Sequence, residues 1–189
     1  LDIDPELPDQ VLIDGNRLRQ ILINLISNAI KFTNEGEVSL ICRGALESEG
    51  RFRYDFSVRD TGIGIAEDQL DVIFGAFAQG DVSASGSFFG AGLGLSISTG
   101  ILQLMDSDLK VESVRESGSN FYFSISLDCR VDERLAFAEE VVPSGLGIYL
   151  DISHPTRQKI IVEQLEHWGF TRSSTVQEAG LLIIDETQL

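Results

Sequence analysis

The chain has 189 residues, of which 43% are hydrophobic and 23% are charged, and this composition is typical of a folded globular protein. On a prior of roughly 100–200 residues per domain, the length allows one complete domain and part of a second. The formal net charge of −16 disfavours nucleic acid or an anionic membrane surface as a partner, because both would repel the chain at long range.

The two cysteines, Cys42 and Cys129, stand far apart and form no Cys/His cluster. The sequence therefore predicts neither a zinc site nor a disulfide framework, and a reducing compartment fits best. No apolar run reaches the length of about 18 residues expected for a membrane helix. The chain starts at Leu1 without a methionine or the basic start of a signal peptide, so we expect it to be cut from a longer protein whose membrane segments lie upstream.

A first helix is predicted for residues 15–33, after a short extended piece at residues 11–13. Its apolar residues recur at helical spacing and are expected to face a core: Leu18, Ile21, Leu22, Leu25, Ile26, Ala29 and Phe32. Two half-buried strands are predicted at residues 37–43 and 51–60. In the second of these strands, alternate residues are apolar and share one face: Phe52, Tyr54, Phe56 and Val58.

A stretch rich in glycine and serine at residues 75–90 leads into a second predicted helix. Four apolar residues are expected to form its buried stripe: Leu93, Ile97, Ile101 and Leu104. Two more strands are predicted at residues 108–113 and 120–128. Because the order is helix, strand pair, helix, strand pair, residues 1–128 are expected to form an α/β two-layer sandwich, with helices on one face of an antiparallel or mixed sheet.

Residues 129–145 are mostly charged or small, and they are predicted to link residues 1–128 to a second, partial domain at residues 146–189. In that domain a strand, a helix and two further strands are predicted at residues 146–150, 155–167, 170–175 and 181–184. This order resembles the first part of the receiver domain of a response regulator. A working receiver clusters acidic residues after its first strand to hold Mg²⁺, whereas Asp151 stands alone, so a degenerate receiver-like α/β domain is expected.

Polar residues that could carry chemistry lie on the first predicted helix and at the end of the strand 51–60. Asn24, Asn28 and Lys31 follow i, i+4, i+7 spacing and share one flank, where they either bind a ligand or are simply solvated. Asp60 is in phase with the apolar face of its strand, and a buried carboxylate needs hydrogen-bond donors. The exocyclic amine of adenine is such a donor, and a carboxylate would disfavour guanine; an Asp that caps a turn is the alternative.

Two glycine-rich segments extend this pattern. Gly62 and Gly64 directly follow the strand and allow the backbone to approach a flat ring closely. Gly90, Gly92 and Gly94 lead into the second helix, whose free N–H groups and positive end can hold phosphates. Their spacing fits neither the P-loop nor the dinucleotide-binding motif.

Taken in order, four segments resemble the N, G1, F and G2 boxes of the histidine-kinase catalytic domain, and the resemblance covers nearly all of residues 7–128. The segments are residues 24–33, 60–65, 74–77 and 90–95. The chain is thus similar to the family with the Bergerat (GHKL) ATP-binding fold, in particular to hybrid sensor histidine kinases. The resemblance implies that ATP and Mg²⁺ are bound, that Asn28 ligates the metal through its amide oxygen, that Lys31 meets phosphate and that Asp60 reads adenine.

The implied ATP site draws on all four boxes, and the segment 75–89 is expected to form a lid over it. Its residues would be Asn24, Asn28, Lys31, Asp60, Gly62, Gly64, Phe74, Phe77, Gly90, Gly92, Leu93 and Gly94. A neutral amide suffices as the protein's metal ligand, because Mg²⁺ prefers oxygen, keeps several waters and takes its negative charge from the triphosphate.

The resemblance also implies that the phosphoryl group goes to a residue outside this chain. ATPases of the fold place a general-base Glu where this chain has Asn24, and an amide cannot act as that base, so hydrolysis should be poor. The only histidines, His154 and His167, do not lie in an acid-flanked phosphoacceptor motif. The expected acceptor is a histidine on upstream dimerisation helices, and the full-length protein is expected to be a homodimer. The chain would lie in the cytoplasmic portion of a membrane-bound bacterial sensor. Its expected partners are a response regulator or further receiver and phosphotransfer domains.

Some residues depart from the family pattern, and most of these lie around the expected lid. The usual Glu-Pro of the F box is Gly75-Ala76, the first glycine of the G2 box is Phe89, and its Thr or Ser is Ala91. Met105 is followed by Asp106-Ser107 where the family commonly has two glycines. A degenerate kinase domain that regulates a partner by binding is therefore the alternative function.

Overall fold

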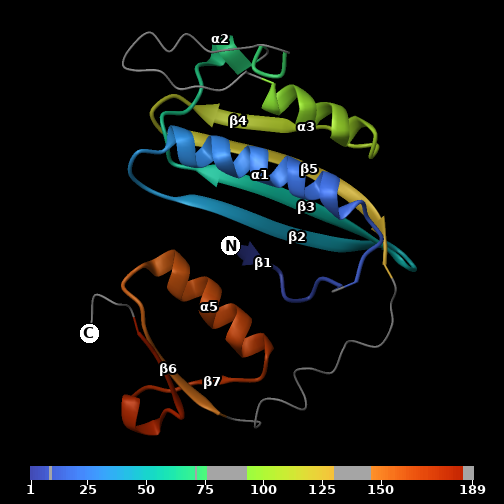
Figure 1. The fold of residues 1–189 in the computed structure, drawn as a ribbon. Coiled ribbons are helices and arrows are strands. Elements are labelled where there is room, and N and C mark those ends of the chain that lie inside the picture. Colours follow the sequence, from blue (N-terminus) through green and yellow to red (C-terminus); the bar gives the residue numbers. More distant parts are fainter. Residues whose placement is uncertain (9, 71, 76–92, 130–145, 185–189) are drawn as a thin grey trace. The chain divides into compact units, whose positions relative to one another are not determined.

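The computed structural model describes most of the chain, and these residues fold into two compact units (Figure 1). The described ranges are residues 1–8, 10–70, 72–75, 93–129 and 146–184. One unit comprises Leu1–Ile3 and Gln10–Arg130, and the other comprises Asp4–Asp9 and Val131–Leu189. The predicted linker lies outside the described residues except for Cys129.

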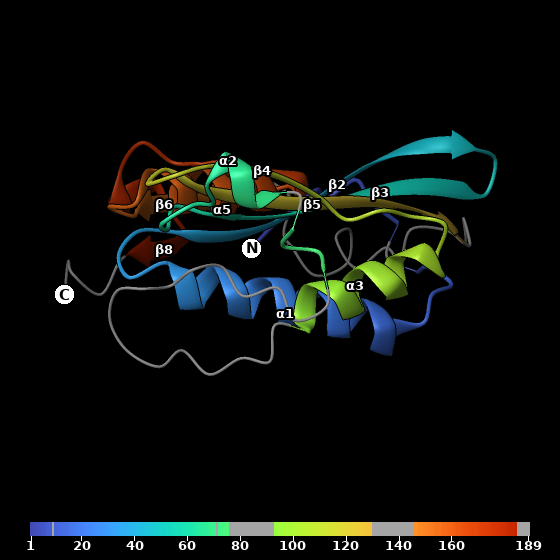
Figure 2. The same ribbon diagram turned by 90° about the horizontal axis from the view of Figure 1, so that it is seen from above.

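The first unit contains a five-stranded sheet in the order β1-β2-β3-β5-β4. Its strands are β1 (Asp2–Ile3), β2 (Val38–Ser48), β3 (Arg51–Asp60), β4 (Lys110–Val114) and β5 (Gly118–Asp128). β1 runs parallel to β2, and the other neighbouring strands are antiparallel. The helices α1 (Gly15–Phe32) and α3 (Gly94–Gln103) lie on one face of this mixed sheet, as Figure 2 shows. The predicted α/β sandwich is therefore confirmed.

The strand β2 is longer than the sequence predicts. It continues from the predicted end at Arg43 to Ser48 and forms a hairpin with β3, in which Val38 pairs with Asp60 and Ser48 pairs with Arg51. The alternation of polar and apolar residues stops at Gly44-Ala45, so the sequence no longer predicts a strand there, although the backbone of β2 continues to pair with β3. Pairing with a strongly alternating neighbour supplies the missing preference.

The helix α1 begins where the sequence provides a cap. Oδ1 of Asp14 accepts the backbone N–H groups of Asn16 and Arg17, each at 3.1 Å. These bonds satisfy two of the four donors that a helix start leaves free. The residues that α1 buries follow helical spacing and are Ile21, Leu25 and Ala29.

The face of β3 that meets the helices is the one predicted from the sequence. Tyr54, Val58 and Asp60 are buried on it, with exposed fractions of 5%, 1% and 6%. Phe56 stacks on Phe123 of β5, with ring centroids 5.1 Å apart. Full burial of a large apolar side chain stabilises a fold by roughly 1.5–3 kcal/mol. Burial of a carboxylate is unfavourable instead, so the burial of Asp60 beside these residues must be offset by hydrogen bonds.

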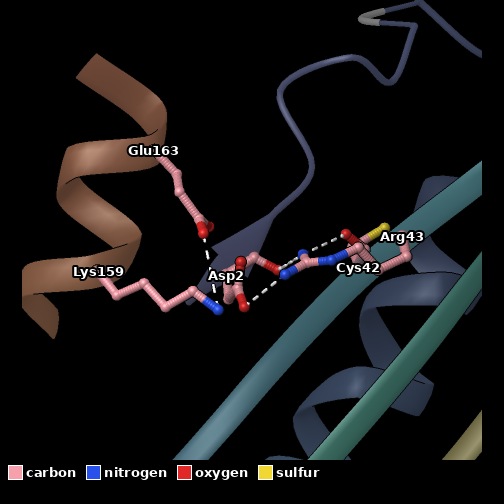
Figure 3. Close-up of polar contacts among 5 residues, drawn as sticks. All are labelled: Asp2, Cys42, Arg43, Lys159 and Glu163. Atoms are coloured by element: carbon pink, nitrogen blue, oxygen red, sulfur yellow. Dashed lines mark hydrogen bonds and ion pairs between the residues drawn. The ribbon is translucent and has the colours of Figure 1, made fainter. Parts of the chain in front are cut away.

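The short edge strand β1 is held to β2 by one arginine. Nη2 of Arg43 lies 2.6 Å from Oδ2 of Asp2, and Nη1 donates to the carbonyl oxygens of Asp2 and Cys42, each at 3.1 Å (Figure 3). Both side chains are partly exposed, so the pair fixes the position of the strand more than it adds to stability.

The predicted buried stripe of α3 is wrong in two of its members. Ile97 is 45% exposed and Leu104 is 89% exposed, and the buried residues are Ser98, Ile101 and Leu102. Leu95 and Leu102 lie on a different side of this helix from Ile97, Ile101 and Leu104, so periodicity alone allows more than one buried stripe. The small Ser98 lets α3 approach α1, and this packing selects the face that is buried.

The second unit is a three-stranded parallel sheet in the order β7-β6-β8 with a crossover helix. Its elements are β6 (Gly147–Asp151), α5 (Pro155–His167), β7 (Thr171–Arg172), a short 3₁₀ turn η1 (Val176–Glu178) and β8 (Leu181–Ile184). Ile148, Leu150 and Ile152 form its core, and Lys159 and Glu163 pair along α5 at 3.7 Å. The predicted helix and last strand have the observed bounds, whereas β7 is shorter than predicted.

The corrected face of α3 can be tested with two leucines at its end. Leu102→Ala is expected to destabilise the first unit by about 2–5 kcal/mol, because it opens a cavity at a fully buried position. Leu104→Ala, the matched control, should change stability by less than about 0.5 kcal/mol. Urea unfolding followed by hydrogen exchange of peptides from β3 and β5 reports this unit alone. Equal losses for the two variants would restore the stripe predicted from the sequence.

Candidate functional site

The carboxylate of Asp60 is the most constrained polar group on the helix-covered face of the sheet. Its Oδ1 accepts the backbone N–H of Gly62 at 2.8 Å and that of Ser119 at 3.3 Å. Among the residues that the structure describes, no donor reaches Oδ2. The two amides therefore fix the orientation of the carboxylate and leave one acceptor oxygen for a ligand.

The loop after Asp60 packs tightly on two other segments, and glycines make this possible. A Cβ on Gly62 would overlap the carbonyl oxygen of Phe32 at the end of α1. Gly64 has φ +64°, and a Cβ there would overlap the carbonyl oxygen of Val114 at the end of β4. The glycines thus let the loop approach neighbouring backbone, and approach to a flat ring stays a prediction.

Hydrogen bonds tie this loop to the C-terminal end of α1. The N–H of Ile63 donates to the carbonyl oxygen of Phe32 at 3.2 Å. Thr61 donates its N–H to the carbonyl oxygen of Glu37 at 3.1 Å and accepts the N–H of Glu37 on Oγ1 at 2.9 Å. These bonds therefore fix the position of the Asp60 carboxylate relative to the polar flank of α1.

The three polar residues on that flank are half-buried but differ in their contacts. Nδ2 of Asn24 donates to Oγ of Ser98 in α3 at 3.0 Å. The amide of Asn28 has no hydrogen-bond partner among the described parts of the chain. Nζ of Lys31 lies 4.9 Å from the centroid of the Phe32 ring. Asn28 thus keeps its amide oxygen for a ligand, whereas Asn24 already contacts protein.

The glycine-rich start of α3 is described only in part. Leu93 is the N-cap residue, is half-buried and makes no side-chain capping bond. Gly94 begins the helix, and a Cβ there would overlap Oδ1 of Asn24. Phe74 lies half-buried in the turn after the short helix α2 (Glu67–Leu70). The other predicted residues of this region, Phe77, Gly90 and Gly92, lie outside the described residues, as do Ala76, Phe89 and Ala91.

Two serines that the sequence analysis did not identify hold Asp60 and the loop that follows it. Ser119 pairs with Asp60 in the β3–β5 register and is 8% exposed. Its Oγ lies 3.0 Å from Oγ of Ser113, which accepts the N–H of Ile65 at 2.8 Å. Both ends of the loop are thereby fixed. The sequence pattern that could have indicated Ser119 is a serine on the same face as Phe121, Phe123, Ile125 and Leu127, in a strand otherwise apolar on that face.

The described residues contain no cluster of three or more His, Cys, Asp or Glu side chains that could hold a metal ion. A divalent cation at this site would thus depend on oxygens of a ligand together with a neutral protein oxygen. In the part of the chain that the structure describes, none of the helices combines the length and the apolar character needed to span a membrane.

Comparison with known proteins identifies the class. The model of the histidine kinase-, DNA gyrase B- and HSP90-like ATPase family matches residues 13–129, so the chain belongs to this family. Residues 13–129 form the ATP-binding catalytic domain of a two-component sensor histidine kinase.

The chain spans between 7% and 35% of the length of three similar proteins. Histidine protein kinase 1 of Candida albicans is 42% identical over 175 residues, which are 93% of this chain and 7% of that protein. The aerobic respiration control sensor protein ArcB of Escherichia coli is 37% identical over 184 residues, 92% of this chain and 21% of that protein. The crystal structure of full-length ShkA with AMPPNP aligns with a TM-score of 0.69 and 30% identity, over 99% of this chain and 35% of that one.

Proposed function

We propose that this catalytic domain binds ATP with Mg²⁺ and gives the γ-phosphoryl group to a histidine on a dimerisation domain outside the chain. The observation that carries the proposal is the buried carboxylate of Asp60. One of its oxygens is occupied by two backbone amides, and the other is left to accept a ligand hydrogen bond. This arrangement fits the amine of adenine.

The base specificity follows from hydrogen-bond chemistry. An ionised carboxylate only accepts, so Oδ2 of Asp60 attracts the exocyclic amine of adenine and repels the carbonyl oxygen that guanine has in the same place. The carboxylate of Asp60 is buried, so a mismatched base would leave its Oδ2 without a hydrogen-bond donor. Gly62 and Gly64 complete this end of the proposed site.

The phosphate end of the proposed site lies between α1 and the start of α3. Asn28 would ligate Mg²⁺ through its amide oxygen, and its lack of a protein partner in the described residues fits that use. The metal supplies charge neutralisation of the triphosphate. Lys31 and the first-turn amides of α3 would bind phosphate oxygens, because a helix start offers free N–H groups and positive potential. Leu93 and Gly94 lie at that start, Gly90 and Gly92 precede it in the sequence, and all four would bind ATP together with Phe74 and Phe77.

Phosphoryl transfer is favoured over hydrolysis by the contact of Asn24. An amide cannot take a proton from water as a carboxylate does, and this amide is already bound to Ser98. Transfer to an external nucleophile needs only positioning and neutralisation of charge, which this site offers. Both histidines of the chain lie in residues 146–184, so the acceptor histidine is proposed to lie on another domain.

The proposal extends to the rest of the protein. In this proposal residues 1–128 are the catalytic ATP-binding domain, residues 129–145 are a linker and residues 146–189 are a partial, degenerate receiver-like domain. The strand order β7-β6-β8 supports the last, because a doubly wound α/β domain begins with this 2-1-3 arrangement. Asp151 is followed by the neutral Ile152 and Ser153, where a working receiver has an acidic cluster that holds Mg²⁺, so phosphorylation of residues 146–189 is expected to be unfavourable. We place the domain on the cytoplasmic side, where ATP is supplied, in a homodimer that works with a response regulator or further receiver and phosphotransfer domains.

Replacing Asp60 tests the adenine-reading role. In Asp60→Asn the carboxamide oxygen must take the place of Oδ1 to accept the amides of Gly62 and Ser119, so the NH₂ group faces the ligand. Affinity for ATP is expected to fall by at least about 30-fold, or ~2 kcal/mol, and the preference for ATP over GTP should narrow. Asp55→Asn, on the other face of β3, is the control and should bind ATP normally. Equal small effects in calorimetric titrations of both variants would remove the role.

Replacing Asn28 tests the metal link. Asn28→Ala is expected to weaken Mg²⁺-dependent ATP binding about tenfold, because one oxygen ligand is lost, and to change Mg²⁺-free ADP binding less than about twofold. Ser27→Ala, exposed on the same helix, serves as the control. A titration in which Asn28→Ala keeps the full gain from Mg²⁺ would show that the metal is held elsewhere.

A further inference from the structure

One polar pair interrupts the apolar contact between α1 and α3. Ser98 is 1% exposed, and its Oγ accepts Nδ2 of Asn24 at 3.0 Å. Leu25, which follows Asn24 on α1, and Leu102, one turn after Ser98 on α3, are both fully buried. A buried hydroxyl that loses its partner is costly, so this bond strongly favours one arrangement of the two helices.

The same asparagine contacts α3 a second time, one turn earlier. A Cβ on Gly94 would overlap Oδ1 of Asn24, so the first residue of α3 lies directly against the amide. A single side chain therefore meets α3 at Gly94 and at Ser98. Two contacts one turn apart fix both the rotation of α3 about its axis and its position along α1.

We propose that Ser98 is a positioning residue which, together with Asn24, sets the first turn of α3 for binding the phosphates of a nucleotide. The inference rests on the proposed function. Asn28 lies one turn after Asn24 on α1, so the spacing between the metal-binding amide and the first-turn N–H groups of α3 depends on this pair. Asn24 then serves the nucleotide through α3. The adenine end, held by Asp60 and its loop, is independent of the pair.

The helix α3 supplies its own control. Thr99 donates Oγ1–H to the carbonyl oxygen of Leu95 at 2.9 Å, within the same helix. Its hydroxyl is similar in kind to that of Ser98, but this hydrogen bond stays within α3 and does not reach α1. Removing it tests for a general effect of losing a hydroxyl from α3.

The test compares ADP, which has phosphates, with adenosine, which has none. Ser98→Ala should weaken ADP binding about fivefold in calorimetry and leave adenosine binding unchanged within about twofold in NMR titrations. Asn24→Ala should show the same selective loss, and Thr99→Ala should show neither. The double variant Asn24→Ala/Ser98→Ala should lose no more than the more affected single variant, because both remove one interaction.

Three results would overturn the inference: unchanged ADP affinity in Ser98→Ala, equal losses for ADP and adenosine, or additive losses in the double variant. Additive losses would mean that Asn24 contacts the nucleotide itself. If Ser98→Ala does not fold, the half-buried Asn24→Ala and the near-isosteric Ser98→Cys carry the same comparison. A wild-type chain that binds neither ADP nor ATP would instead reject the proposed function, and the inference with it.

Discussion

The buried carboxylate of Asp60 is the constraint around which the candidate site is arranged. Burying a charge is unfavourable unless donors replace water, and here two backbone amides supply them on one oxygen. These amides come from the loop after β3 and from β5, so the loop and the strand register must both be correct for the carboxylate to be tolerated. Ser113 and Ser119 hold the loop from behind.

From this carboxylate the frame extends to the polar flank of α1. Thr61 and Ile63 bond the backbone around the C-terminal end of that helix, and Asn24 joins it to the first turn of α3. The adenine end and the phosphate end of the proposed site therefore use different contacts of one helix. In the proposed site, the adenine and the phosphates of ATP can thus be bound through different contacts of α1, and each contact can contribute separately to the binding free energy.

Much of the frame could be predicted from the sequence, because it depends on local periodicity. The alternation in Arg51–Asp60 gave the buried phase of Asp60, and helical spacing gave the buried face of α1. The buried face of α3 was predicted incorrectly because its apolar residues lie on two sides, and tertiary packing, which buries Ser98 and Leu102 but not Leu104, is not contained in the helical pattern. The extension of β2 and the serine pair behind Asp60 depend on cross-strand pairing, which a single strand pattern does not contain.

The resemblance of the four boxes supplied the class of ligand, and the structure supplies contacts that the boxes do not state. Asn24 and Asn28 look equivalent in the sequence, yet one amide bonds α3 and the other has no partner among the described residues. In the proposed function, two asparagines one turn apart therefore have separate roles, with Asn24 positioning α3 and Asn28 binding the metal.

The central claim is that this domain passes a phosphoryl group to a histidine outside itself. The most direct measurement mixes the chain with γ-labelled ATP, Mg²⁺ and a separately supplied dimerisation domain from the full-length protein. Label is expected on the acceptor histidine, stable to base and labile to acid, and none is expected when that histidine is replaced by alanine. Rapid release of labelled phosphate by the chain alone, with no label on the histidine, would contradict it.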